Sequence, residues 1–177
     1  MADVVKVGFV GCGGNAKGHM RSVAKLENAK IVATCDMVQD LANAAATEFE
    51  AKAYTCHEAM MDAEKPDAVY ISIPVHAHGA PEMAAIERGI PFLVEKPVAR
   101  DMATAKKVGA AVTKAGLMTA VGYQLRYYGS ATAAKQLMAG RPINLVLGRY
   151  ISGTGRGGRC ACGLLRGLSL CPNNCHR

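Results

Sequence analysis

The stretch Val5–Met20, VKVGFVGCGGNAKGHM, decides the fold, because it has the pattern of an apolar strand, a glycine-rich turn and the start of a helix. Gly11 permits a tight turn, Gly13 lets backbone approach a pyrophosphate, and the small Ala16 allows helix and strand to pack closely. The first N–H groups of the helix are unpaired and attract an anion. The residues expected to contact a dinucleotide in this loop are Gly11, Gly13, Gly14 and Asn15.

A carboxylate at the end of the next predicted strand supports this interpretation. A glycine cluster alone is weak evidence, since it is more often only a turn. Residues 30–36 form an apolar run ending in Asp36, which lies 25 residues after Gly11. Such folds place an acid near this position to bind the adenosine ribose. The negative charge favours NAD over NADP, although nearby basic residues can reverse the preference. The alternative is that Asp36 only caps the next helix.

The rest of the first 123 residues alternates between strand and helix patterns. Strands are expected over residues 53–54, 67–73, 91–94 and 117–121, and helices over 39–49 and 57–63, before Arg88, and after Asp101 as far as Ala115. This alternation with short connections predicts an α/β fold with a doubly wound parallel sheet. Ligands of such sheets bind beyond the carboxyl ends of the strands. The segments expected to converge there are Gly11–Asn15, Asp36, Pro74–His78, Glu95–Lys96 and Gln124–Arg126.

Composition and charge narrow the class of protein. The chain has 177 residues and a net charge of +7, but all 14 acidic residues lie at or before Asp101. The basic residues of 102–152 are scattered at helical surface spacings, so a solvated face is preferred to a nucleic-acid interface. No apolar run approaches membrane-spanning length, and the N-terminus lacks a signal-peptide pattern. We therefore expect a soluble, cytoplasmic protein that binds neither nucleic acid nor membrane.

Taken together, the motifs resemble the Gfo/Idh/MocA family (glucose–fructose oxidoreductase, inositol dehydrogenase and rhizopine catabolism) over roughly residues 5–152. The matching stretches are Val7–His19, Cys35-Asp36, Ile73–His78, Gly89–Ala99 with its Glu95-Lys96-Pro97 core, and Gly122–Tyr127. The resemblance implies an NAD(P)-binding Rossmann domain followed by an open-faced α/β domain. It also implies hydride transfer between a nicotinamide cofactor and a hydroxyl or carbonyl carbon, commonly on a sugar, inositol or related polyol.

The resemblance assigns roles to individual residues. Lys96 is the expected catalytic residue, because its ammonium would hold the substrate oxygen that gains negative character as hydride leaves. Glu95 would fix this lysine or the nicotinamide amide. The alternative to a catalytic role is that Glu95 and Lys96 are only an exposed Glu-Lys pair on a loop. The other residues expected to contact cofactor are Ile73, Pro74, His78 and Gln124, and those expected to contact substrate are Arg126 and Tyr127. For His19, a role in helix packing is preferred.

The resemblance ends in the last quarter of the chain. A carboxylate and a histidine four residues apart, which the family's second half supplies for proton transfer, have no counterpart, because Pro172 stands four residues before His176. We expect domains at 1–123 and 124–152, the latter with a linking helix at 130–139 and one strand at 143–151. The chain is expected to be truncated near Ser152, with 153–177 a disordered, aberrant tail. Because the truncation leaves the second domain incomplete, the family's homo-oligomer is not expected to form.

Two other interpretations of that tail remain, a basic nucleic-acid-binding segment and a zinc site. The zinc interpretation is weakened because its cysteines lack the usual paired spacing. The residues that would form such a site are Cys160, Cys162, Cys171, Cys175 and His176. The sequence thus predicts an oxidoreductase by ancestry whose own catalytic competence is in doubt. The alternative is a non-catalytic dinucleotide-binding module or the remnant of a truncated gene.

Overall fold

The computed structural model describes residues 4–142, 145–150 and 161–165. The chain divides into two compact units, of which the first ends at Tyr123 and the second begins at Gln124. Each unit is described by itself below.

The first unit is built on a six-stranded parallel sheet with the strand order β3-β2-β1-β4-β5-β6. Its strands are β1 (Val5–Val10), β2 (Ala29–Cys35), β3 (Lys52–Tyr54), β4 (Ala68–Ile71), β5 (Phe92–Val94) and β6 (Thr119–Val121). This confirms the predicted doubly wound sheet. The strand order reverses between β1 and β4, the point at which such sheets open a crevice for ligands.

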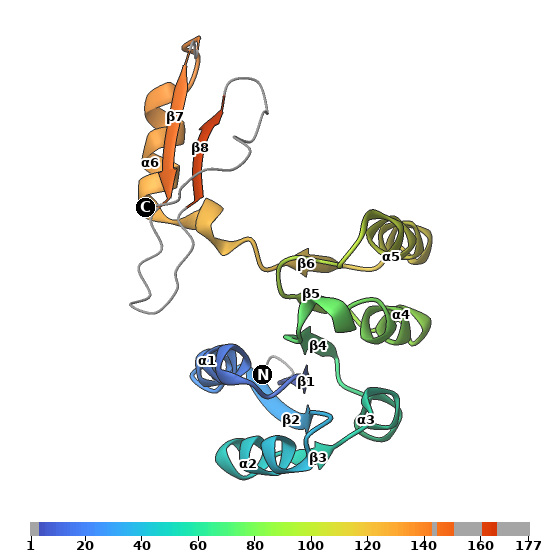
Figure 1. The fold of residues 1–177 in the computed structure, drawn as a ribbon. Helices are drawn as coiled ribbons and strands as arrows, with labels where there is room; N and C mark the ends of the chain where they lie inside the picture. Colours follow the sequence, from blue (N-terminus) through green and yellow to red (C-terminus); the bar gives the residue numbers. More distant parts are fainter. Residues whose placement is uncertain (1–3, 143–144, 151–160, 166–177) are drawn as a thin grey trace. The chain divides into compact units, whose positions relative to one another are not determined.

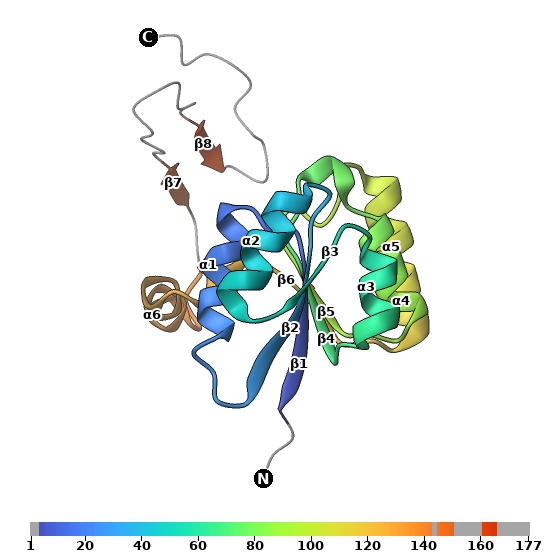
Figure 2. The same ribbon diagram turned by 90° about the horizontal axis from the view of Figure 1, so that it is seen from below.

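Five helices cover both faces of this sheet. They are α1 (Gly14–Val23), α2 (Gln39–Phe49), α3 (His57–Glu64), α4 (Ala80–Glu87) and α5 (Met102–Ala115). Helices α1 and α2 lie on one face, and α3, α4 and α5 lie on the other (Figure 1, Figure 2). A short 3₁₀ turn, η1 (Val75–Ala77), precedes α4. Because both faces are covered, the strands can be apolar along their length, as the sequence pattern indicated.

The core consists of two apolar clusters, one on each side of the sheet. Neighbouring residues of β1 belong to different clusters, since successive side chains of a strand point to opposite faces. Phe9 packs with Ala16 and Met20 of α1, whereas Val10 packs with Ile71 and residues of α3, α4 and α5. All of these side chains are buried. Packing of Phe9 and Val10 before the glycine loop, and of Ala16 and Met20 after it, therefore fixes the position of the loop at the end of the sheet.

The limits of α5 follow the predicted pattern. The Asp101 carboxylate accepts a hydrogen bond from the Thr104 amide at 2.8 Å, and Gly116 ends the helix in the left-handed conformation with φ of 61°. The Thr104 amide also lowers the pKa of Asp101 below its usual value. Both ends of this helix were predictable because caps depend on local residue chemistry.

The second unit contains η2 (Gln124–Tyr127), α6 (Gly129–Met138), β7 (Val146–Tyr150) and β8 (Ala161–Leu165). Strands β7 and β8 pair antiparallel, with Gly148 opposite Gly163. Strand β7 lies within the strand expected at 143–151, and β8 lies within the segment expected to be a disordered tail. The apolar run Ala161–Leu165 satisfies one open edge of β7. Of the zinc candidates, Cys160, Cys171, Cys175 and His176 lie outside the described residues.

Candidate cofactor site

Gly11 occupies a position that only glycine tolerates. Its φ is +95°, and a Cβ built on it would overlap the backbone carbonyl oxygen of Ser72. Its amide donates to the Cys35 carbonyl at 2.7 Å. The turn is thus pressed against the ends of β2 and β4, which is the tight-turn role predicted for this glycine.

The next two glycines leave open space over the loop. A Cβ added to Gly13 or Gly14 would meet nothing within 4 Å, and Gly13 has an ordinary extended backbone. Gly13 is the N-cap of α1, and no side chain caps the helix there. The bare backbone and the uncapped amides fit a pyrophosphate group, which needs close approach and N–H donors.

Asp36 ties the end of β2 to the glycine loop. Its carboxylate accepts hydrogen bonds from the Cys12 amide at 2.8 Å and the Val38 amide at 2.9 Å. The N-cap of α2 is Val38, so the alternative role of Asp36 as the cap of that helix is wrong. The acid is half-buried beside the loop. It therefore lies where an acid that binds the adenosine ribose is expected.

The loop also reaches the end of β4. The Asn15 side-chain amide donates to the Ser72 hydroxyl at 3.5 Å. Ile73 follows, half-buried, and Pro74 is exposed. Since β1 and β4 are neighbours across the switch point, Asn15, Ile73 and Pro74 line the same edge of the sheet. Their contact with cofactor stays a prediction.

Glu95 is the most heavily bonded carboxylate of this edge. It is 5% exposed, and it accepts from His19 Nε2 at 2.9 Å, the Tyr70 hydroxyl at 3.2 Å and the Lys96 amide at 3.2 Å. Burial raises the pKa of Glu95, but the Lys96 amide and the side chains of Asn15, Tyr70 and His19 outweigh it, so the pKa is lowered. The buried side chain is therefore a carboxylate with its partners in place.

Lys96 and Gly122 flank this carboxylate. The Lys96 side chain is exposed at the end of β5, and the Lys96–Pro97 peptide bond is cis. A Cβ on Gly122 would lie 3.2 Å from the Glu95 carboxyl group. Glycine at 122 thus leaves the space that Glu95 occupies, a role that sequence reasoning missed.

His19 and Tyr70 were also missed as site residues. Besides its bond to Glu95, His19 stacks on the Tyr70 ring with centroids 4.6 Å apart. Tyr70 in turn stacks on Phe9, its partner in the β1–β4 register, at 5.2 Å. His19 packs as predicted, but its ring also reaches the site. One signal was present, since Asn15 and His19 are four residues apart and share a face of α1.

His78 is enclosed by protein. Its side chain is 1% exposed and that of Glu82 is 0% exposed, and His78 Nδ1 lies 2.6 Å from Glu82 Oε1. The other Glu82 oxygen accepts from the Gly79 amide at 2.6 Å. His78 Nε2 is buried without a hydrogen-bond partner. The ring therefore faces the interior between η1 and α4, which argues against the predicted direct contact with cofactor.

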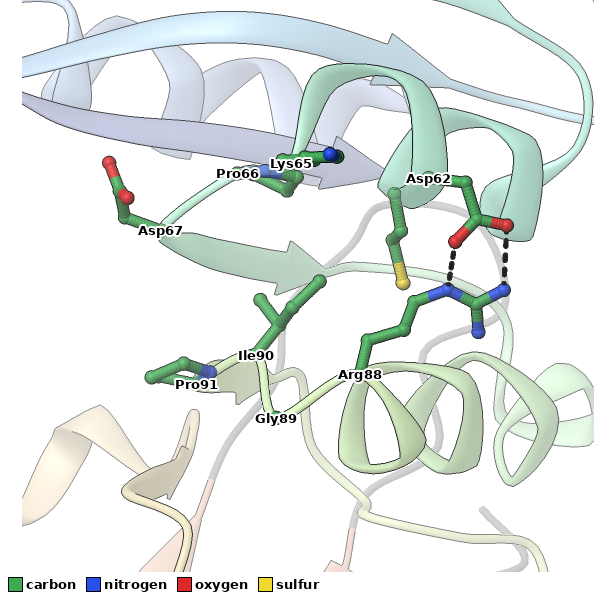
Figure 3. A pocket seen from close by; sticks show the side chains of 9 residues that line it. Asp62, Lys65, Pro66, Asp67, Arg88, Gly89, Ile90 and Pro91 are labelled. Atoms are coloured by element: carbon green, nitrogen blue, oxygen red, sulfur yellow. Dashed lines mark hydrogen bonds and ion pairs between the residues drawn. The ribbon is translucent and has the colours of Figure 1, made fainter.

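A pocket of about 550 Å³ lies at the opposite edge of the sheet. It is formed by the residues that precede β4 and β5, together with the ends of α3 and α4, and Figure 3 shows Arg88 bonded to Asp62 across it at 2.6 and 2.9 Å. Its lining residues are Met61, Asp62, Lys65, Pro66, Asp67, Arg88, Gly89, Ile90 and Pro91. Because it lies at the amino ends of the strands, this pocket is distinct from the cofactor crevice.

Gln124, Arg126 and Tyr127 belong to η2 of the second unit and are exposed. The Arg126 guanidinium lies 5.6 Å from the centre of the Tyr127 ring. Their predicted roles toward cofactor and substrate stay predictions. Within the described ranges, no group of three metal-ligating side chains could hold an ion, and no helix is long and apolar enough to cross a membrane.

The fold and the glycine loop define a dinucleotide-binding protein of the doubly wound α/β class. Residues 5–123 match the Gfo/Idh/MocA family, which is described as an oxidoreductase family with an NAD-binding Rossmann fold. The chain belongs to this family, as the sequence motifs indicated.

Individual relatives agree with this assignment. An inositol 2-dehydrogenase of Streptomyces avermitilis is 30% identical over 152 residues, covering 82% of this chain and 44% of the relative. An inositol 2-dehydrogenase/D-chiro-inositol 3-dehydrogenase of Halalkalibacterium halodurans is 34% identical over 127 residues, which cover 70% of this chain and 36% of the relative. The crystal structure of scyllo-inositol dehydrogenase from Lactobacillus casei, with bound NAD(H) and scyllo-inositol, matches with a TM-score of 0.73 and 26% sequence identity. The match covers 77% of this chain and 41% of that protein. The chain thus spans about two fifths of each relative's length.

Proposed function

We propose that the first unit binds NAD across the carboxyl ends of β1, β2 and β4, as part of an oxidoreductase that acts on an inositol, sugar or similar polyol. The observation that carries the proposal is the pairing of an open glycine backbone at Gly13 with the Asp36 carboxylate beside it. The family description and the NAD(H) bound to the Lactobacillus casei relative support the same cofactor. The negative charge of Asp36 disfavours the 2′-phosphate of NADP.

The chemistry at the other end of the crevice follows from Glu95 and Lys96. When bound, the nicotinamide ring accepts hydride from an alcohol or returns it to a ketone. The Lys96 side chain is exposed, and the backbone amide of Lys96 donates a hydrogen bond to the buried Glu95 carboxylate. A cation there stabilises the substrate oxygen as it gains negative charge. The substrate class rests on the relatives, which are named as inositol dehydrogenases.

Asp36→Asn tests the cofactor assignment. The amide keeps the size of the side chain but removes the charge and one of the two oxygens that accept from the Cys12 and Val38 amides. NAD affinity is therefore expected to fall by at least roughly 10- to 100-fold, the cost of losing a charged hydrogen bond. Isothermal titration calorimetry of the full chain measures this. Asp40→Asn, at an exposed acid of the neighbouring helix α2, is the matched control and is expected to leave affinity unchanged. Equal affinities for all three proteins would contradict the proposed site.

The second candidate function is cofactor binding without turnover. It is supported by the first unit, which by itself carries both the glycine loop and the Asp36 carboxylate. Reduction of NAD across a panel of inositols and sugars separates the two functions. Binding together with turnover supports the oxidoreductase, and binding alone supports the module.

A further inference from the structure

We propose that Tyr70 is a positioning residue for Lys96, and that it acts through the Glu95 carboxylate at the end of β5. The inference rests on the proposed function, since it takes the nicotinamide end of NAD to lie beside Glu95 and Lys96. It extends that function by assigning a role to the hydroxyl group of a residue of β4.

The register of the sheet brings Tyr70 and Glu95 together. Tyr70 of β4 is paired with Leu93 of β5, and Glu95 lies two residues beyond Leu93. The Glu95 amide donates to the Ile71 carbonyl at 2.8 Å, so the pairing of the two strands continues as far as Glu95. Because side chains two residues apart in a strand point to the same face, Glu95 shares a face with Tyr70. The Tyr70 hydroxyl donates to Glu95 Oε1 at 3.2 Å.

Two ring stacks hold the Tyr70 phenol in place. One is with Phe9 of β1, with centroids 5.2 Å apart and ring planes 9° apart, and the other is with His19 of α1, at 4.6 Å and 26°. Burial and the neighbouring Glu95 raise the pKa of Tyr70, so the phenol stays protonated. The hydroxyl is therefore a fixed donor to the carboxylate.

Glu95 passes this orientation to the backbone of Lys96. Its second oxygen, Oε2, accepts from the Lys96 amide at 3.2 Å, while Oε1 also lies 2.9 Å from His19 Nε2. The carboxyl group packs against Gly122, where a Cβ would lie 3.2 Å from it. Partners on both oxygens and a backbone wall beside them fix the carboxylate. The Lys96 side chain is exposed, so the position of its backbone determines the region that its ammonium can reach.

Loss of the Tyr70 hydroxyl is expected to loosen the Lys96 backbone and to weaken binding at the nicotinamide end alone. A ligand that contacts a loosened segment must order it, and this costs affinity. The adenosine and pyrophosphate groups are proposed to lie on the glycine loop and Asp36, so their binding does not carry that cost. The net worth of one hydrogen bond corresponds to about three- to tenfold in affinity.

The test compares the full chain with Tyr70→Phe, which keeps the ring for both stacks and removes only the hydroxyl. Calorimetry at one pH measures the dissociation constants of NAD and of ADP-ribose, which lacks the nicotinamide ring. Tyr70→Phe is expected to weaken NAD binding about three- to tenfold and to leave ADP-ribose binding unchanged. Tyr54→Phe is the matched control, because the Tyr54 hydroxyl also donates to a carboxylate, that of Glu64. It should leave both affinities unchanged.

A second measurement needs neither coenzyme nor, in its first step, a variant. Hydrogen exchange followed by NMR should show the Lys96 amide of the original protein to be protected, although its side chain is exposed. In Tyr70→Phe this amide should exchange about three- to tenfold faster, a larger change than at the Gly11 amide, which is bonded to the Cys35 carbonyl. A purely structural role of Tyr70 would change both amides alike.

The outcomes separate this role from the proposed function. If both ligands bind but Tyr70→Phe changes their affinities equally or not at all, the role of Tyr70 is overturned while the proposed function stands. An unprotected Lys96 amide in the original protein, or one that exchanges no faster in the variant, also overturns it. If folded original protein binds neither NAD nor ADP-ribose, the proposed function fails, and exchange at Lys96 still decides whether Tyr70 holds this segment.

Discussion

Gly11→Ala is expected to destabilise the first unit by about 2–5 kcal/mol. The new Cβ overlaps the backbone carbonyl oxygen of Ser72. Because this oxygen belongs to the backbone, it cannot move away by a change of side-chain rotamer. Alanine must also adopt a φ near +95°, a conformation that costs on the order of 1–3 kcal/mol. Urea unfolding should show a lower midpoint with an unchanged slope.

Gly13→Ala is the matched control for this prediction. The substitution is the same and lies two residues away, but the added methyl group meets no atom within 4 Å and the backbone angles are ordinary. Stability should change by less than about 1 kcal/mol, the scale of an altered N-cap, while NAD binding weakens because the methyl group covers the approach to the backbone. Equal unfolding midpoints for the two variants would show that the turn does not depend on the Gly11–Ser72 contact.

Glu82→Ala is the second substitution with a large expected effect, about 3–5 kcal/mol of lost stability. The carboxyl group is fully buried and serves two partners, His78 Nδ1 and the Gly79 amide. Removing it leaves both without a partner, and His78 Nε2 already has none. It also opens a cavity at the start of α4, which adds to the penalty. Chemical denaturation followed by far-UV circular dichroism measures the change.

Glu87→Ala serves as the control on the same helix. Glu87 is exposed, so its removal should alter the free energy of unfolding by less than about 0.5 kcal/mol. Glu82→Gln should fall between the two, because an amide oxygen can still accept from Gly79. A loss from Glu82→Ala no greater than that from Glu87→Ala would mean that the buried pair contributes nothing to stability.

The fold could be predicted because its determinants are local. Glycine at 11, the apolar run that ends in Asp36, and Asp101 with Gly116 around α5 each act within a few residues, and the structure confirms the elements that they predicted. The alternation of strands with helices predicted a doubly wound parallel sheet, whereas the strand order comes from the structure. Even the closeness of Asp36 to the loop could be inferred, since parallel neighbours end at the same edge.

The details of the site depend on contacts that span much of the chain. His19 and Glu95 are 76 positions apart, and no periodicity in the sequence connects them. His78 was expected to face the cofactor because it follows a strand, but Glu82 four residues later is turned inward with it. Whether a polar residue after a strand points outward or inward depends on the packing of the next helix, and local pattern does not encode that.

Both oxygens of the Asp36 carboxylate accept hydrogen bonds from backbone amides, and this affects how coenzyme preference could be engineered. The usual route to a phosphorylated coenzyme is to replace such an acid with a small or basic residue. Here the same two oxygens hold the amides of Cys12 and Val38, so that replacement also removes what keeps the turn closed. A redesign would first need a new acceptor for those two amides, and only then a positive charge for the phosphate.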